Sequence, residues 1–340
     1  MQRRSLIKGL AAFGVAPAFV RAQGSREAFK FNLGWKVEAP AAGFLLAHQR
    51  GYYRDAGLDV AIDTGNGSAS AISLVAGGAY DCASADLATM IEFNVANPAS
   101  SLRAVCIQYD LNPNAIIVRK GGPIAKPSDL AGKDILGQPF NASRKLFPVF
   151  AKSQGIDMSG IKWENVAPDI GDTRFAKGDF DAAAYFYFTG LLNLKSRGIP
   201  LDQLTVFRFS DYGMKSYGNG LVVSNKTTAQ RPEALAAFVK ATTRGWIETI
   251  ADPRAGAAAI KSRERLANEQ IELERLGLII DGTMKTPDTA ANGWGAATPV
   301  RMQATIDETV DAFALKGKPT LDESWTDRFL PSAAERRLKS

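Results

Sequence analysis

The order of apolar and polar positions predicts that strands and helices alternate along the first third of the chain. Short apolar runs rich in β-branched residues are typical of buried strands, and apolar residues three or four positions apart are typical of helices. Strands are expected at 29–35, 58–65, 79–86 and 102–109, and helices at 39–57, 68–78 and 88–97. Short helices between apolar strands indicate a parallel sheet that is covered on both faces. We therefore predict an α/β fold.

A second series of the same kind follows, and helices end the chain. Its strands are expected at 133–138, 161–166, 181–188 and 203–209, its helices at 143–154 and 172–177, and the final helices at 232–250, 255–267, 269–278 and 299–317. Two extended segments, 112–118 and 220–223, join the two series. This order predicts two lobes, with mainly parallel sheets and a two-strand hinge between them. Residues 29–113 with 223–335 would form the first lobe and 114–222 the second, with a helical C-terminal wrap.

The first 22 residues have the features of an export signal. Arg3 and Arg4 precede an apolar run at 10–20, and a small-residue cleavage region ends at Ala22. The run is shorter than the ~20 residues that span a bilayer. The segment RRSLIK resembles a twin-arginine signal, and an ordinary secretory signal is the alternative. Both predict a mature chain, cleaved near Ala22, in the periplasm.

Composition narrows the class of protein. The chain has 340 residues, 46% hydrophobic and 22% charged, as in an ordinary globular protein of about two domains. The net charge of +6 lies largely in the export signal. The nearly neutral remainder argues against nucleic acid as the main partner, because that binding requires clustered positive charge. For Cys82 and Cys106, a disulfide and two buried thiols are both open. The lone His48 and two distant cysteines leave no metal cluster.

The chain lacks the usual patterns of catalytic residues. G-x-S-x-G is absent, and the glycine-rich segment 65–68 is not followed by the Lys-Ser/Thr of a phosphate-binding loop. No Ser, His and Asp set falls on the predicted loops. Asp179 and Asp181 have the positions of turn and strand-start residues. We therefore predict a binding protein, not an enzyme, without a cofactor.

Ligands of open α/β sheets bind where loops leave the carboxyl ends of the strands. In the first lobe, Trp35 follows the first strand and offers a face for stacking, with a core position as the alternative. Asn66, Gly67 and Ser68 open a helix with small side chains that expose N–H groups to a carbonyl or anionic oxygen. Ser68 alternatively caps this helix. Asp86 ends the third strand, where it would accept from an amine or cap the next helix.

The hinge and the second lobe add further candidates. Tyr109 stands at the first crossing between the lobes. Ser143 and Arg144 open a helix, and the planar guanidinium of Arg144 suits a carboxylate or sulfonate, with a surface position as the alternative. The aromatic run YFYF continues the strand expected at 181–188, and strand alternation turns Tyr185 and Tyr187 to one face. One face of this strand would be core, and its end would reach the cleft.

Several segments occur in the order found in one known family. They are HQRGYYRDAGLDV, GNGSASAISLVAGGAYDCASADLATM, KPSDLAGKDI, FAKGDFDAAAYF, PEALAAFVKATTRGWIETIADP and ESWTDRFLP. With them the chain resembles the ABC-transporter solute-binding proteins of the nitrate, sulfonate, taurine and thiamine-pyrimidine-precursor group over residues 29–331. The resemblance implies a type II periplasmic-binding fold, a small-molecule ligand and an ABC permease in the inner membrane as partner. We expect a monomer.

Within this family, DYGMKSYGNGLVV is similar to the thiamine-pyrimidine-precursor branch. The chain has Thr189-Gly190 where relatives often have an acidic residue, and it lacks the cysteine-rich metal motif of the pyrimidine-synthase relatives. The expected ligand is small and planar, pyrimidine-like or aromatic. A taurine-type sulfonate is one alternative. An exported enzyme that acts on a thiamine-pyrimidine precursor is the other.

Overall fold

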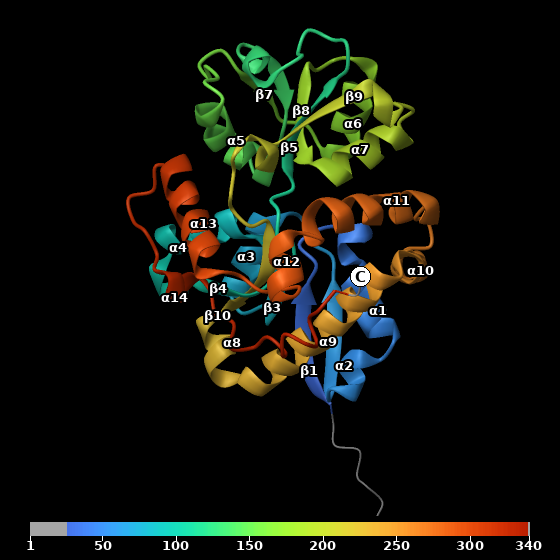
Figure 1. Ribbon diagram of the computed structural model, residues 1–340, viewed down its shortest axis with the longest axis vertical. Coiled ribbons are helices and arrows are strands. Elements are labelled where there is room, and N and C mark those ends of the chain that lie inside the picture. Colours follow the sequence, from blue (N-terminus) through green and yellow to red (C-terminus); the bar gives the residue numbers. More distant parts are fainter. Residues whose placement is uncertain (1–25, 339–340) are drawn as a thin grey trace, which may run out of the picture.

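The protein has two lobes, each built on a five-stranded sheet (Figure 1). The computed structural model describes residues 26–338. The first sheet has the order β2 (Leu58–Asp63), β1 (Glu27–Asn32), β3 (Cys82–Asp86), β10 (Asn219–Ser224), β4 (Leu102–Ile107). The second has the order β7 (Lys162–Glu164), β6 (Asp134–Leu136), β8 (Ala182–Phe186), β5 (Asn114–Arg119), β9 (Leu204–Arg208). The predicted α/β class with two mainly parallel sheets is confirmed.

One strand in each sheet runs against its neighbours. These are β10, which is antiparallel to β3 and β4, and β5, which is antiparallel to β8 and β9. Both strands follow a crossing between the lobes. Because Asn219 already pairs with Asp86, the return to the first lobe begins at Asn219 and not at residue 223 as predicted. Asn-Gly is typical of a linker, but here its backbone continues the ladder.

Helices follow the strands in both lobes and carry their N-termini toward the junction (Figure 1). The first lobe has α1 (Ala42–Gln49), α2 (Tyr52–Asp55), α3 (Ser68–Ala76) and α4 (Leu87–Ala96). The second has α5 (Ala142–Ser153), α6 (Pro168–Lys177) and α7 (Tyr187–Ser196). The sequence analysis missed α7 and extended the strand β8 to residue 188. The aromatic run has high strand propensity, but Phe188 and Leu192 are fully buried one helical turn apart.

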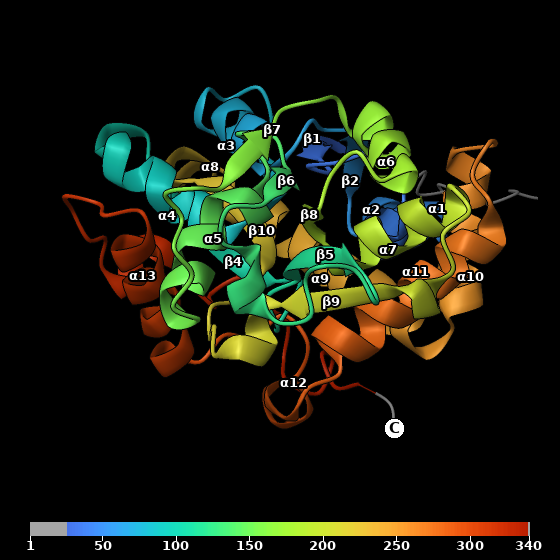
Figure 2. The ribbon, with the colours of Figure 1, turned by 90° about the horizontal axis from the view of Figure 1, so that it is seen from above.

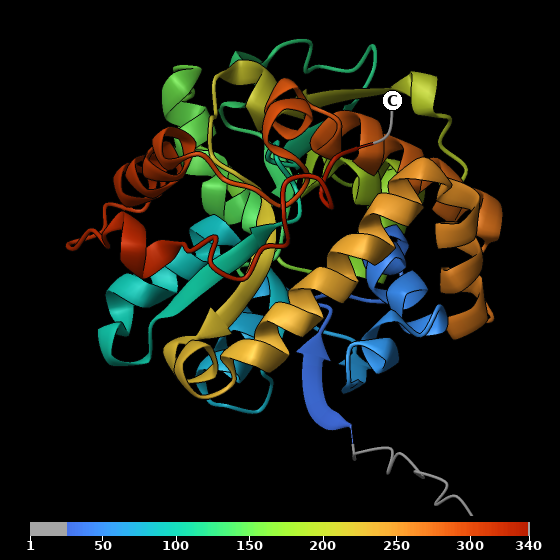
Figure 3. The same cartoon turned by 60° about the horizontal axis from the view of Figure 1, so that its bottom comes forward.

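The remaining helices wrap around the first lobe, as predicted. They are α8 (Asn225–Gln230), α9 (Pro232–Ala251), α10 (Pro253–Arg263), α11 (Glu269–Ile279), α12 (Pro287–Asn292), α13 (Pro299–Ala312) and α14 (Leu321–Ser324), with a π-helical turn at Ile280–Met284. Figure 3 shows the long gold helix α9 lying across this lobe beside the blue α1. Within residues 26–338, no helix is long and apolar enough to cross a membrane.

Glycine allows α1 and α9 to cross at close range. A Cβ on Gly245 would lie 2.2 Å from the carbonyl oxygen of Gly43, and a Cβ on Gly43 would lie 2.3 Å from the Trp246 ring. Trp246 is fully buried and packs edge-on against Phe44, with ring centroids 5.6 Å apart. The missing side chains therefore let the two backbones approach and bring the tryptophan into the core.

The lobes also touch on both sides of the two crossings (Figures 1 and 2). On the side of α11, the Tyr187 hydroxyl on α7 donates to the carbonyl of Leu278 at 2.5 Å. On the side of α13, Lys152 on α5 pairs with Asp311 at 2.6 Å. These contacts join the second lobe to the first on both sides of the crossings.

Candidate ligand-binding site

A cavity of about 110 Å³ lies between the lobes. Its first-lobe wall comes from the loop after β1, from Ser84 within β3, from the start of α3 and from Asn219 at the start of β10. Its second-lobe wall comes from the starts of α5, α6 and α7. It is lined by Leu33, Gly34, Trp35, Pro40, Gly67, Ser68, Ser84, Tyr109, Gln138, Phe140, Asn141, Ala142, Pro168, Tyr185, Phe186, Thr189, Asn193 and Asn219. The cavity therefore lies at the strand ends where ligands of α/β sheets bind.

Aromatic rings from both lobes face this cavity. Trp35 comes from the first lobe, Tyr109 from the first crossing, and Phe140, Tyr185 and Phe186 from the second lobe. Such surfaces favour flat ligands, because rings stack face to face or edge to face at little conformational cost. The cavity therefore offers stacking surfaces on more than one side.

The backbone at Gly34 places Trp35. Gly34 has φ of +74°, and a Cβ there would lie 2.1 Å from the carbonyl oxygen of Ser84. Only glycine accommodates both conditions. The carbonyl groups of Gly34 and Trp35 then accept hydrogen bonds from Gly67 at 2.8 Å and Gly65 at 3.0 Å. The loop after β1 is thereby tied to the loop before α3, and both border the cavity.

The structure brings some of the predicted first-lobe residues to the cavity. Gly67 and Ser68 line it, whereas Asn66 is exposed outside the lining. The Ser68 hydroxyl accepts from the backbone N–H of Asp86 at 3.0 Å. Asp86 is fully buried outside the lining, and its Oδ1 caps α4 by accepting from the Thr89 N–H at 2.8 Å. Burial raises the pKa of the Asp86 carboxyl.

Tyr185 lines the cavity, and the residues after it are placed differently from the prediction. Its hydroxyl donates to Asp172 Oδ1 at 2.5 Å, and Asp172 Oδ2 accepts from Asn193 at 3.0 Å. Tyr187 does not share this face, because β8 ends at Phe186 and Tyr187 begins a helix. The interpretation of Tyr185 and Tyr187 as one strand face is therefore wrong. Tyr187 bonds to α11 instead, and burial raises its pKa to about 12.

Ser143 and Arg144 lie at the start of α5 but do not line the cavity. The Ser143 hydroxyl donates to Asn114 Oδ1 at 2.7 Å. Arg144 Nη1 donates to the carbonyl of Gly137 at 2.8 Å, and its guanidinium lies 5.0 Å from the Trp163 ring centroid. The partners of this guanidinium are therefore a carbonyl and a ring of its own lobe.

Several lining residues did not stand out in the sequence. Asn193 lies on α7, which was not predicted, and Asn219 is the first residue of β10, one position before the predicted segment 220–223. Phe140 lies in a loop just before α5 and is 43% exposed. The Asn141 side chain accepts from the Ser143 N–H at 2.8 Å, a capping role that its position before a helix suggests.

The lining of the cavity is mainly apolar, and its polar groups are uncharged. Among the described residues that form it, none is Asp, Glu, Lys, Arg or His. Its ionisable groups are the hydroxyls of Tyr109 and Tyr185, whose pKa values burial raises further. A charged ligand that enters such a cavity loses hydration without gaining a counter-charge from the lining side chains. The wall therefore suits a neutral molecule.

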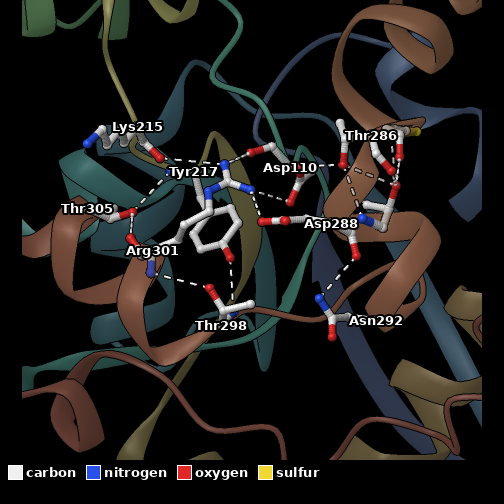
Figure 4. Close-up of polar contacts among 11 residues, drawn as sticks. Asp110, Lys215, Tyr217, Thr286, Asp288, Asn292, Thr298, Arg301 and Thr305 are labelled. Atoms are coloured by element: carbon white, nitrogen blue, oxygen red, sulfur yellow. Dashed lines mark hydrogen bonds and ion pairs between the residues drawn. The ribbon is translucent and has the colours of Figure 1, made fainter.

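Helix α13 holds both crossings between the lobes (Figure 4). Arg301 Nη1 donates to Asp110 Oδ1 in the first crossing at 2.8 Å and to Asp288 at 2.9 Å. The same guanidinium lies 4.2 Å from the ring centroid of Tyr217 in the second crossing. One turn further, Thr305 accepts from the Tyr217 N–H at 3.1 Å. Tyr217 is therefore a buried part of the hinge and does not face the cavity.

The next turn of α13 adds further hydrogen bonds to the second crossing. Glu308 accepts from the backbone N–H groups of Lys215 and Ser216, each at 2.9 Å. The first-lobe ends of both crossings are thereby fixed to one helix.

The chain matches the model of the family described as NMT1/THI5 like over residues 39–256. The chain belongs to the NMT1/THI5-like family. Its sequence is 23% identical over 281 residues to the formylaminopyrimidine-binding protein of Halalkalibacterium halodurans, covering 79% of this chain and 82% of that protein. It is 26% identical over 158 residues to the riboflavin-binding protein RibY of Chloroflexus aurantiacus, covering 45% of this chain and 42% of that protein.

Solved structures share the architecture of this NMT1/THI5-like chain. The periplasmic sulfonate-binding protein SsuA of Methylobacillus flagellatus aligns with a TM-score of 0.64 at 16% identity, over 92% of this chain and 94% of that one. At this identity the likeness shows the fold. The solute-binding family resemblance inferred from the sequence is confirmed by the family match and by these relatives.

Proposed function

We propose that this protein is the receptor of an ABC importer, and that its lobes close on one small, neutral, planar ring with polar edges. The observation that carries the proposal is the interlobe cavity, which combines aromatic rings with uncharged polar groups. A ligand that touches both lobes favours the closed arrangement by its differential affinity for it. An ABC permease in the inner membrane would then take the ligand from the closed receptor.

A pyrimidine-like ring fits this proposal best. The relative with the longer match is named for binding formylaminopyrimidine, and the other is named for binding riboflavin. Both ligands contain flat nitrogen heterocycles. A sulfonate carries a full negative charge, and the arginine that the sequence offered for it lies outside the lining, bonded to Gly137.

We propose that the receptor is exported. We also propose that its ligand contacts are Trp35, Gly67, Ser68, Tyr109 and Tyr185, which all line the cavity. The predicted signal at 1–22 lies outside the described residues, and it supports a receptor that works in the periplasm. We also propose that the receptor is a monomer. For Asn66, Asp86, Ser143, Arg144 and Tyr187, we propose supporting positions around the cavity instead of direct contact.

The test is calorimetric titration of the chain without residues 1–22 and of two variants, with an aminopyrimidine, riboflavin and an alkanesulfonate. Base stacking on an aromatic side chain contributes about 1–3 kcal/mol. Trp35→Ala should therefore weaken heterocycle binding by about 5- to 100-fold. Arg144→Ala serves as the control and should change this affinity less than about twofold, because its side chain does not line the cavity.

A different pattern would overturn the proposal. If the alkanesulfonate is the tight ligand, and Arg144→Ala abolishes its binding while Trp35→Ala does not, the receptor is specific for anions. If the heterocycle is recovered chemically changed after incubation, the protein is an enzyme.

A further inference from the structure

A chain of hydrogen bonds with a fixed direction runs along the first-lobe wall of the cavity. Gln108 is 1% exposed, and its Nε2 donates to the carbonyl of Pro40 at 3.0 Å. A carbonyl only accepts, so this bond determines which end of the Gln108 amide faces Pro40. The Gln108 Oε1 must then face the other way, where it accepts from the Ser84 hydroxyl at 2.5 Å.

The orientation of the Asn219 amide follows from the hydrogen bond that Ser84 makes. Because the Ser84 hydroxyl has given its single proton to Gln108, it is an acceptor toward any further neighbour. Asn219 Nδ2 lies 3.5 Å from this oxygen and is the donor. The opposite end of the Asn219 amide is therefore its oxygen. Asn219 Oδ1 is buried and has no hydrogen-bond partner among residues 26–338.

The same series of hydrogen bonds leaves the hydroxyl proton of Tyr109 without an acceptor. The Tyr109 hydroxyl accepts from Gln108 Nε2 at 3.2 Å, which uses a lone pair and leaves its own proton. No residue in the described part of the chain accepts that proton. Ser84, Tyr109 and Asn219 all line the cavity. The wall thus has an unpaired acceptor at Asn219 and an unpaired hydroxyl proton at Tyr109, and the carbonyl of Pro40 sets the direction of both.

We propose that Asn219 determines specificity by accepting a hydrogen bond from an N–H group of the ligand, while Tyr109 donates to an acceptor atom of the same ligand. The inference rests on the proposed function and adds the chemistry of the ring edge. A ring with an amino group beside a ring nitrogen meets both requirements, because the amino group donates to Asn219 and the ring nitrogen accepts from Tyr109. A buried acceptor without a partner destabilises the empty cavity, and the ligand N–H removes this cost.

The experiment compares two rings of the same shape, an aminopyrimidine and the pyrimidine with methyl in place of the amine. The wild-type chain should bind the amino ring about 10- to 100-fold more tightly in calorimetric titration. In Asn219→Leu, which keeps a similar volume without an acceptor, this ratio should fall to about one. Asn219→Asp retains an acceptor and should keep the preference. Asn225→Leu removes an exposed amide outside the cavity and is the matched control.

The variant Ser84→Ala tests the series of hydrogen bonds that orients the Asn219 amide. Without the Ser84 oxygen, the Asn219 amide is free to turn, so the preference for the amino ring should shrink while both rings still bind. Tyr109→Phe should weaken both rings, because both keep the ring nitrogen.

The outcomes separate the two proposals. If both rings bind the wild type equally, or the ratio is unchanged in Asn219→Leu, the role of Asn219 is wrong while the receptor stands. If neither ring binds the wild type, the proposed function fails and this inference falls with it. If Asn219→Leu does not fold, Asn219→Asp and Ser84→Ala decide the question.

Discussion

Cys82 and Cys106 lie on strands that flank β10. Cys82 is opposite Val223 and Cys106 is opposite Leu221, so one strand separates them. Two interstrand spacings put their backbones about 10 Å apart, beyond the ~7 Å between Cα atoms that a disulfide allows. Both thiols are free and buried. Burial raises the pKa of Cys106 to about 12 and that of Cys82 well above its usual value.

We therefore predict that both thiols stay reduced and unreactive in the folded protein. A thiol-reactive chromophore should label neither cysteine under native conditions and both in denaturant. Between pH 9 and pH 12 the unfolded Cys106 thiol ionises and the folded one does not, so the free energy of unfolding should fall as pH rises through this range. A disulfide found by mass spectrometry of unreduced protein would contradict the prediction.

For single residues, the sequence predicted which loops reach the cavity better than it predicted where each side chain points. Trp35 and Ser68 line the cavity because strand ends and helix starts converge there, which periodicity predicts. Arg144 has an equally suitable position, but its guanidinium lies by Gly137 and Trp163. That direction depends on tertiary neighbours that no local pattern encodes.

At the scale of elements, the crossing of α1 and α9 depends on the absence of side chains. A methyl group on Gly245 meets the Gly43 carbonyl at 2.2 Å, and backbone atoms do not give way as flexible side chains do. The helices would have to separate, and the packing around Trp246 would loosen. Overpacking of this kind typically costs about 1–3 kcal/mol.

We predict that Gly245→Ala lowers the thermal midpoint by several degrees, measured by circular dichroism. Gly277→Ala is the matched control, because Gly277 also lies within a helix but has nothing within 4 Å of the added methyl. Alanine is the better helix former, so this variant should hold or raise the midpoint. Equal loss in both variants would show that the close crossing does not limit stability.

Elements were predictable where the pattern is local. The alternation of apolar strands and amphipathic helices marks most of both sheets. It failed at α7, where Tyr187 and Phe188 have strand propensity and the strand really ends at Phe186. It also failed at Asn219, where a turn-like sequence pairs with Asp86. In both places, contacts with distant segments override local preference.

At the scale of the whole molecule, one helix of the first lobe holds both crossings of the hinge. Arg301 and Glu308 hold the first-lobe ends of both crossings on α13. The cavity walls come from both lobes, so a ligand in it stabilises the closed arrangement directly. The order of the two lobes was readable from the sequence, whereas the uncharged character of the cavity required the three-dimensional arrangement.

The central claim is that the cleft binds a neutral planar ring. The most direct measurement is a thermal-shift screen of the chain without residues 1–22 against pyrimidines, flavins, aromatic carboxylates and alkanesulfonates. A ligand at about 100 times its dissociation constant stabilises the folded state by about 2.7 kcal/mol, which raises the midpoint by several degrees. We predict this rise for a neutral pyrimidine-like ring and none for the sulfonates. A rise with sulfonates alone would contradict the account.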